Sequence, residues 1–112
     1  MRRFALLAAV VAVLLTAAPV SAYRTYSGVS SEKVRFYVHQ AGTLRFEVHA
    51  VNESVDTECV FGVIGGSDLR IQVALRPGGG TLVSTAHRRM ARGRHALAVS
   101  SECPWSITIQ RV

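Results

Sequence analysis

Strict alternation of apolar and polar side chains between residues 33 and 50 is the feature that most limits what this chain can fold into. Successive side chains of a β-strand point to opposite faces, so a period of two predicts strands with one buried face. The alternation occurs in two runs. Their apolar positions are Val34, Phe36 and Val38, then Leu44, Phe46, Val48 and Ala50. We therefore expect two half-buried strands.

The stretch between the two runs, residues 40–42, has the length of a hairpin turn. The sequence Gln-Ala-Gly predicts a three-residue connection in which Gly42 adopts a positive φ. In the register that this turn sets, Phe36 lies opposite Phe46 and every inward-facing partner is apolar. A slip by one residue would bury charged side chains, so we expect this register to be firm.

The outward positions of the same expected hairpin carry charge and one aromatic ring. Arg35 would lie opposite Glu47 and Tyr37 opposite Arg45, which makes an ion pair and a cation–π pair. Tyr37, Arg35 and Arg45 would then form a small exposed patch. Ordinary cross-strand pairing explains the same residues without a ligand.

The rest of the chain shows short apolar or alternating runs divided by turn residues. These runs predict strands over 59–64, 69–75, 81–85, 95–100 and 105–110. Residues 23–32 form a loose lead-in or a short edge strand, and residues 52–58 a loop. Turns are expected at 65–68 and 77–80, and a basic loop at 86–94. About seven strands in one domain predict an all-β fold, an antiparallel two-sheet β-sandwich of jelly-roll or Ig-like type. A small closed barrel is the alternative.

Residues 1–22 have the three parts of a secretory signal: Arg2 and Arg3, an apolar run, and small residues ending at Ala22. We expect cleavage after Ala22, which leaves residues 23–112 as a single secreted or periplasmic domain. Thr16 and Pro19 interrupt the apolar run, which makes it short for the alternative, a membrane anchor. Removal of the leader lowers the formal net charge from +6 to +4, so the exported domain stays basic.

Two cysteines, Cys59 and Cys103, are the only ones in the chain. In an oxidising compartment they have one possible pairing, and their wide separation does not resemble a redox-active dithiol. We expect a structural disulfide. By the chain-entropy model, a loop of this length stabilises a small domain by roughly 4 kcal/mol.

The segment from His87 to Arg94 concentrates positive charge, with arginines at 88, 89, 92 and 94. Arginine binds phosphate, sulfate and carboxylate groups in bidentate fashion, so Arg88, Arg89, Arg92 and Arg94 are the candidate ligand-binding residues. The expected partner is an anionic polymer of a bacterial envelope or an acidic protein surface. A loop that merely aids solubility is the competing interpretation. Nucleic acid is not expected, because most aromatic side chains fall on inward positions.

The remaining polar residues show no recognisable catalytic or metal-binding pattern. The four histidines, at 39, 49, 87 and 95, do not combine with cysteine or carboxylate at metal-ligand spacing, so neither a metal nor a cofactor is expected. The chain has no nucleophile elbow of the Gly-x-Ser-x-Gly kind. A non-catalytic binding, accessory or structural role is therefore favoured, with a small hydrolase built on loops as the alternative. Trp105 alternates with Ile107 and Ile109, which indicates a core side chain instead of a sugar platform. Asn52 opens an N-glycosylation acceptor pattern.

The C-terminal part of the chain resembles a known family of modules. Residues 92–99 (RGRHALAV) and 103–109 (CPWSITI) are similar to the close of bacterial pre-peptidase C-terminal domains and related secreted β-sandwich modules. The resemblance covers roughly residues 34–112. It implies a non-catalytic, jelly-roll-like unit of the kind found beside secreted enzymes. His95 stands where that family usually has an aromatic residue. The acidic cluster that some members use for calcium is absent, and only Asp68 lies near the corresponding turn.

Overall fold

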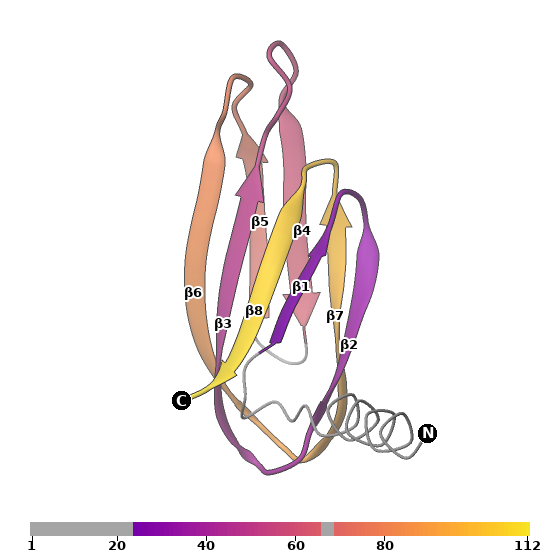
Figure 1. The fold of residues 1–112 in the computed structure, drawn as a ribbon, viewed down its shortest axis with the longest axis vertical. Coiled ribbons are helices and arrows are strands. Elements are labelled where there is room, and N and C mark those ends of the chain that lie inside the picture. Colours follow the sequence, from indigo (N-terminus) through magenta and orange to yellow (C-terminus); the bar gives the residue numbers. More distant parts are fainter. Residues whose placement is uncertain (1–23, 66–68) are drawn as a thin grey trace, which may run out of the picture.

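A computed structural model describes residues 24–65 and 69–112, and it arranges them as eight β-strands in two layers (Figure 1). Within these ranges no helix is present that is apolar and long enough to cross a membrane. The expected leader, residues 1–22, and the expected turn with Asp68 lie outside the described residues. The strands are β1 (Arg24–Gly28), β2 (Glu32–Val38), β3 (Gly42–Val51), β4 (Cys59–Gly65), β5 (Leu69–Leu75), β6 (Thr81–Met90), β7 (Gly93–Ser101) and β8 (Trp105–Arg111).

The strands form two antiparallel four-stranded sheets, one in the order β1-β8-β3-β6 and the other in the order β2-β7-β4-β5. We call them sheet A and sheet B. The predicted class, an all-β two-sheet sandwich, is confirmed, and the closed barrel is excluded because each sheet has two edges. The strand beyond the expected seven is β1, at an edge of sheet A. Of the consecutive strands, only β4 and β5 are hydrogen-bonded neighbours; every other connection crosses between the sheets.

The predicted hairpin of β2 and β3 is wrong, because β2 lies in sheet B and β3 in sheet A. Phe36 and Phe46 do meet, but across the sandwich, with ring centroids 6.1 Å apart and an edge-on geometry. The alternating apolar residues of the two strands are buried by packing of one sheet on the other, and not by a hydrogen-bonded ladder between the strands. Gly42 is not among the glycines with positive φ.

The connection that crosses from β2 to β3 is held by the last strand. The guanidinium group of Arg111 donates hydrogen bonds to the carbonyl oxygens of Gln40, at 2.8 Å, and Ala41, at 3.1 Å. A Cβ atom at Gly42 would lie 2.7 Å from a nitrogen of that guanidinium group. Gly42 therefore gives Arg111 room to close the crossover, and it does not supply a tight turn.

The core lies between the two sheets and contains the inward positions that the alternation predicted. Its large, fully buried side chains come from both layers, with Phe46 and Ile107 from sheet A and Phe61 and Leu97 from sheet B. Trp105 is also buried, and its indole N–H donates to the carbonyl oxygen of Ser30 at 2.9 Å. The prediction of a core tryptophan is confirmed.

The predicted basic loop at 86–94 is wrong for most of its length. β6 continues to Met90 and β7 begins at Gly93, which adopts a φ of 132°, so only Ala91 and Arg92 connect the strands. The basic residues do not stop the strand, because β6 is an edge strand whose polar side chains reach water. The last two strands, β7 and β8, likewise lie in different sheets.

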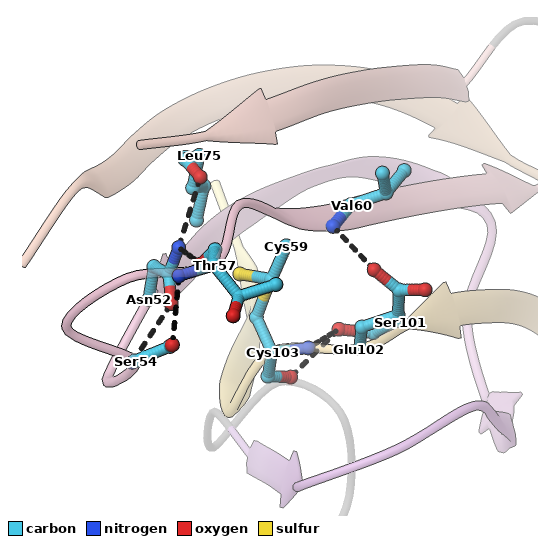
Figure 2. The surroundings of a disulfide bond; sticks show 9 residues. All are labelled: Asn52, Ser54, Thr57, Cys59, Val60, Leu75, Ser101, Glu102 and Cys103. Carbon is cyan, nitrogen blue, oxygen red and sulfur yellow. Dashed lines mark hydrogen bonds between the residues drawn. A yellow bond between two sulfur atoms is a disulfide. The ribbon is translucent and has the colours of Figure 1, made fainter. Parts of the chain in front are cut away.

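The disulfide Cys59–Cys103 ties the start of β4 to the connection between β7 and β8 (Figure 2). Two hydrogen bonds flank it: the backbone N–H of Glu102 donates to the Val60 carbonyl oxygen at 2.9 Å, and Val60 N–H donates to the side-chain carboxylate of Glu102 at 3.1 Å. Ser101 closes the turn, because its hydroxyl group both accepts from Cys103 N–H and donates to the Cys103 carbonyl. The predicted pairing of the cysteines is confirmed.

Asn52 fastens the neighbouring loop at the same end of the sandwich (Figure 2). Its side chain is 1% exposed. The amide nitrogen donates to the carbonyl oxygens of Thr57, at 2.8 Å, and Leu75, at 3.0 Å, and the amide oxygen accepts from Ser54 N–H at 2.9 Å. The glycosylation pattern therefore falls on a buried structural amide, which a glycosyltransferase cannot reach in the folded chain.

Candidate functional site

Most arginines and most carboxylates lie at opposite ends of the sandwich, with Arg76, beside the disulfide end of β5, as an exception. At the end where β2 passes to β3 and β6 to β7 lies a group of arginines that we call the basic end: Arg24, Arg35, Arg45, Arg88, Arg89, Arg92, Arg94 and Arg111. At the opposite end, around the disulfide, lie the carboxylates of Glu32, Glu53, Asp56, Glu58 and Glu102. The registers of the strands establish this separation, since β3 begins beside Met90 and ends beside Thr81. Figure 1 shows both ends.

The four predicted site arginines do not lie on one surface. Arg88 and Arg89 alternate along β6 in sheet A, Arg92 lies in the connection, and Arg94 lies on β7 in sheet B. Arg88 is half-buried on the inward side of β6 and donates to the carbonyl oxygen of His87 at 2.7 Å. The cluster that is compact in the sequence is therefore divided between two sheets, and its four side chains do not share one loop.

A groove at the basic end brings together a different set of arginines. Arg24 from β1, Arg35 from β2 and Arg94 from β7 line it, together with Tyr37 and His95 among others, and its volume is about 610 Å³. All three arginines are exposed, and none of their guanidinium groups makes a hydrogen bond or ion pair with another residue of the described ranges. No carboxylate is among the described residues that line the groove. We call it the arginine groove.

The pairing of β2 with β7 places two of these arginines. Tyr37 lies opposite Arg94 and Arg35 opposite Ala96 on the outer face of sheet B. The expected exposed patch of Tyr37 with Arg35 is thus present, but Arg94 takes the place assigned to Arg45. Arg45 instead points outward from sheet A, where it donates to Gln110 at 2.6 Å.

Aromatic rings stiffen this part of the site. The ring of His95 stacks on Phe36, with centroids 5.7 Å apart, and its Nε2 lies 2.7 Å from the carbonyl oxygen of Ala91. Because a carbonyl only accepts, Nε2 carries the hydrogen and donates it. Tyr37 lies 4.7 Å from the ring of His39. These contacts orient the strand segments that carry Arg35 and Arg94.

Sequence reasoning missed Arg24 and did not connect Arg35 with Arg94. The outward alternation of Arg35 and Tyr37 was the available signal, and it marked half of the site. The other half depends on which strand pairs with β2, and on β1 pairing with the last strand. Neither of these pairings follows from local patterns.

Other polar clusters lie outside the arginine groove. The hollow beside the disulfide, of about 470 Å³, is lined by Glu53, Glu58 and Glu102 among others. Within the described ranges, no three or more His, Cys, Asp or Glu side chains are grouped so that they could hold a metal ion. His49 contacts Glu47 at 3.2 Å on the outer face of sheet A, away from the groove. These clusters show no arrangement as distinctive as the three arginines.

Comparisons with known proteins give little to set beside this geometry. No family model matches the chain, and no curated protein matches its sequence. Eight chains of solved structures match it, among them the pre-peptidase C-terminal domain of collagenase from Bacillus anthracis. That domain has 13% sequence identity and a TM-score of 0.37, and the match covers 78% of this chain and 86% of that one. The resemblance expected from the sequence is thus confirmed as a weak one, and it says nothing of what this chain binds.

Proposed function

We propose that this chain is an exported, non-catalytic β-sandwich protein that binds an anionic partner in the bacterial cell envelope or outside the cell, through the arginine groove. One observation carries the proposal. Arg24, Arg35 and Arg94 come from three strands and both sheets, and they line one groove without a carboxylate among its described residues. Like charges gathered at one place raise the free energy of the isolated domain, and a bound anion would relieve it.

The chemistry of the groove fits an oxyanion. Guanidinium groups form paired hydrogen bonds with phosphate, sulfate or carboxylate, and such bonds are about twice as strong as neutral ones. Arg35 and Arg94 stand on neighbouring strands, so their spacing is fixed by the sheet and little order is lost on binding. The surrounding basic end extends the positive field and would speed the approach of an anion.

Catalysis is supported less well than binding. The one histidine known to line the groove, His95, uses Nε2 in a bond to the backbone and has no carboxylate beside it in the groove to orient it as a base. The alternative of a small hydrolase therefore lacks an acid–base pair at the site that the geometry favours. Export is supported by the leader pattern of residues 1–22 and by the disulfide, which persists in oxidising compartments.

Binding of inorganic polyphosphate and of heparin tests the proposal, measured by isothermal titration calorimetry on the purified protein. R35A/R94A should weaken binding of polyphosphate about a hundredfold, because each charge-assisted contact contributes about 1.5 kcal/mol or more. R76A/R89A removes the same charge from exposed arginines that do not line the groove, and should change affinity less than threefold. Salt should weaken binding by the wild-type protein.

Equal losses in the two double variants would contradict the proposal, because binding would then follow net charge and not the groove. Binding that neither variant changes would contradict it as well. A third variant, R88A/R89A/R92A, measures what the basic residues outside the groove contribute. We expect a smaller loss than in R35A/R94A, even though this variant removes more charge.

A further inference from the structure

The two outer faces of the sandwich differ in chemistry. The outer face of sheet A is polar, and its side chains bond to one another. Thr25 and Thr108 are linked at 3.0 Å, and the Arg45–Gln110 and Glu47–His49 contacts lie on the same face. Most polar side chains of this face thus have partners within the molecule, although Val83 of β6, on the same face, is 66% exposed.

The outer face of sheet B is small, apolar and cationic. Two of its largest apolar side chains are well exposed, Val60 at 41% and Ile64 at 54%. Among the described outward positions of its four strands there is no Asp or Glu. These positions are Lys33, Arg35 and Tyr37 on β2, Arg94, Ala96, Ala98 and Ser100 on β7, Val60, Gly62 and Ile64 on β4, and Arg70, Gln72 and Ala74 on β5.

Gly62 stands in the middle of this face, in a strand with neighbours on both sides. Glycine weakens a strand interior and often marks a place where another molecule approaches closely. The fold does not require it here. Its φ is outside the positive range, and a Cβ atom would lie 3.5 Å from the Ile71 carbonyl oxygen and 3.7 Å from that of Ser100, which are ordinary contacts.

The missing side chain leaves a hollow over the centre of the sheet. Its volume is about 370 Å³, and its lining includes Val60 and Ile64 on either side of Gly62, Ala98 and Ser100 from β7, and Arg70 from β5. The hollow adjoins the arginine groove, because Ala96 lines the groove and Ala98, the next outward residue of β7, lines the hollow. One continuous surface therefore joins the arginine groove, with Arg24, Arg35 and Arg94, to the hollow over Gly62, which we also call the apolar recess.

We propose that this surface docks an acidic protein partner, which inserts an apolar side chain into the hollow over Gly62 and places carboxylates on Arg35, Arg94 and Arg70. The inference rests on the proposed function and names the class of its partner. A second copy of the chain that docked through this same face does not fit, because it would set cations against cations. A polyphosphate or sulfated polymer fits the arginines but has nothing to fill the recess.

A pair of synthetic acidic peptides tests the recess separately from the charges. Both are runs of aspartate, and they differ only in a central leucine or alanine; affinities are measured by fluorescence anisotropy. The wild-type protein should bind the leucine peptide about tenfold more tightly, as expected for burial of the larger side chain. G62L should reduce this ratio to about one, and G62A to a value between the two. T85L, which adds a leucine to the outer face of sheet A, should leave the ratio unchanged.

The outcomes separate the two proposals. If both peptides bind equally to the wild-type protein while R35A/R94A still loses polyphosphate, the recess has no role and the arginine groove stands. If R35A/R94A binds polyphosphate as the wild-type protein does, the proposed function itself fails. Vesicles of phosphatidylglycerol provide a third arm. If the wild-type protein binds the vesicles, and G62L weakens vesicle binding as much as it weakens binding of the leucine peptide, the partner is a lipid surface and the inference is overturned. Circular dichroism of G62L should match the wild type, since the added Cβ atom makes only ordinary contacts and the rest of the side chain extends into the hollow.

Discussion

Replacing Asn52 by alanine should destabilise the sandwich far more than its place in a polar loop suggests. The side chain makes three hydrogen bonds with neutral partners, two as donor and one as acceptor, and it is almost fully buried. Each such bond contributes about 1 kcal/mol, and a buried carbonyl left without a donor costs about 1–3 kcal/mol. The hydrogen bond to the Leu75 carbonyl oxygen is buried, so removal of the Asn52 amide would leave that oxygen without a donor. We therefore expect Asn52→Ala to lower the free energy of unfolding by about 3 to 4 kcal/mol.

Equilibrium unfolding in urea measures this loss, followed by the fluorescence of Trp105, the one tryptophan in the chain. Trp105 is buried in the native state, so unfolding should move its emission to longer wavelength. Glu53→Ala is the matched control, because Glu53 is the next residue, is exposed, and should change stability by no more than about 0.5 kcal/mol. A loss below 1 kcal/mol for Asn52→Ala would refute the reasoning, since it would mean that water replaces these bonds at little cost.

Three further predictions follow from the same end of the sandwich and from the core. The double variant C59A/C103A should lose about 4 kcal/mol in urea titrations, as expected for a loop of 44 positions; an unchanged midpoint would show that the disulfide does not restrain the unfolded chain. Gly80→Ala should unfold the domain or lower its melting temperature sharply in calorimetry, because its Cβ atom would lie 2.6 Å from the carbonyl oxygen of Arg76; wild-type melting would contradict that contact. Trp105→Phe should lower the melting temperature by several degrees, since the Ser30 carbonyl oxygen loses its hydrogen-bond donor. An unchanged melting temperature would contradict this, because it would mean that water donates to that oxygen equally well.

The sequence predicted the layers of this fold better than its connections. Alternation identified the buried side chains of β2 and β3 correctly, because burial of one face is a local property of each strand. It could not decide whether Phe36 meets Phe46 as a ladder partner or across the core, because both arrangements bury the same residues. That choice was made by strands far away in the chain, β7 for β2 and β8 with β6 for β3.

The candidate site was predictable to a smaller extent for the same reason. The sequence located the arginine-rich segment, and Arg94 does line the groove. Arg88 and Arg89, adjacent in the sequence, diverge because neighbouring residues of a strand face opposite ways. Arg24 joins Arg94 only because β1 pairs with β8 at an edge of sheet A, a contact across nearly the whole chain. The importance of Gly62 became visible once its free space was known.

The partner of the first strand has a consequence for how the polypeptide is made. Within the described part of the chain, β1 is hydrogen-bonded to β8 alone, and β8 in turn separates it from β3. Until residues 105–111 have left the ribosome, β1 has no strand to pair with, and sheet A lacks β8, the strand between β1 and β3. Sheet A is therefore expected to be completed only after residues 105–111 have been synthesised.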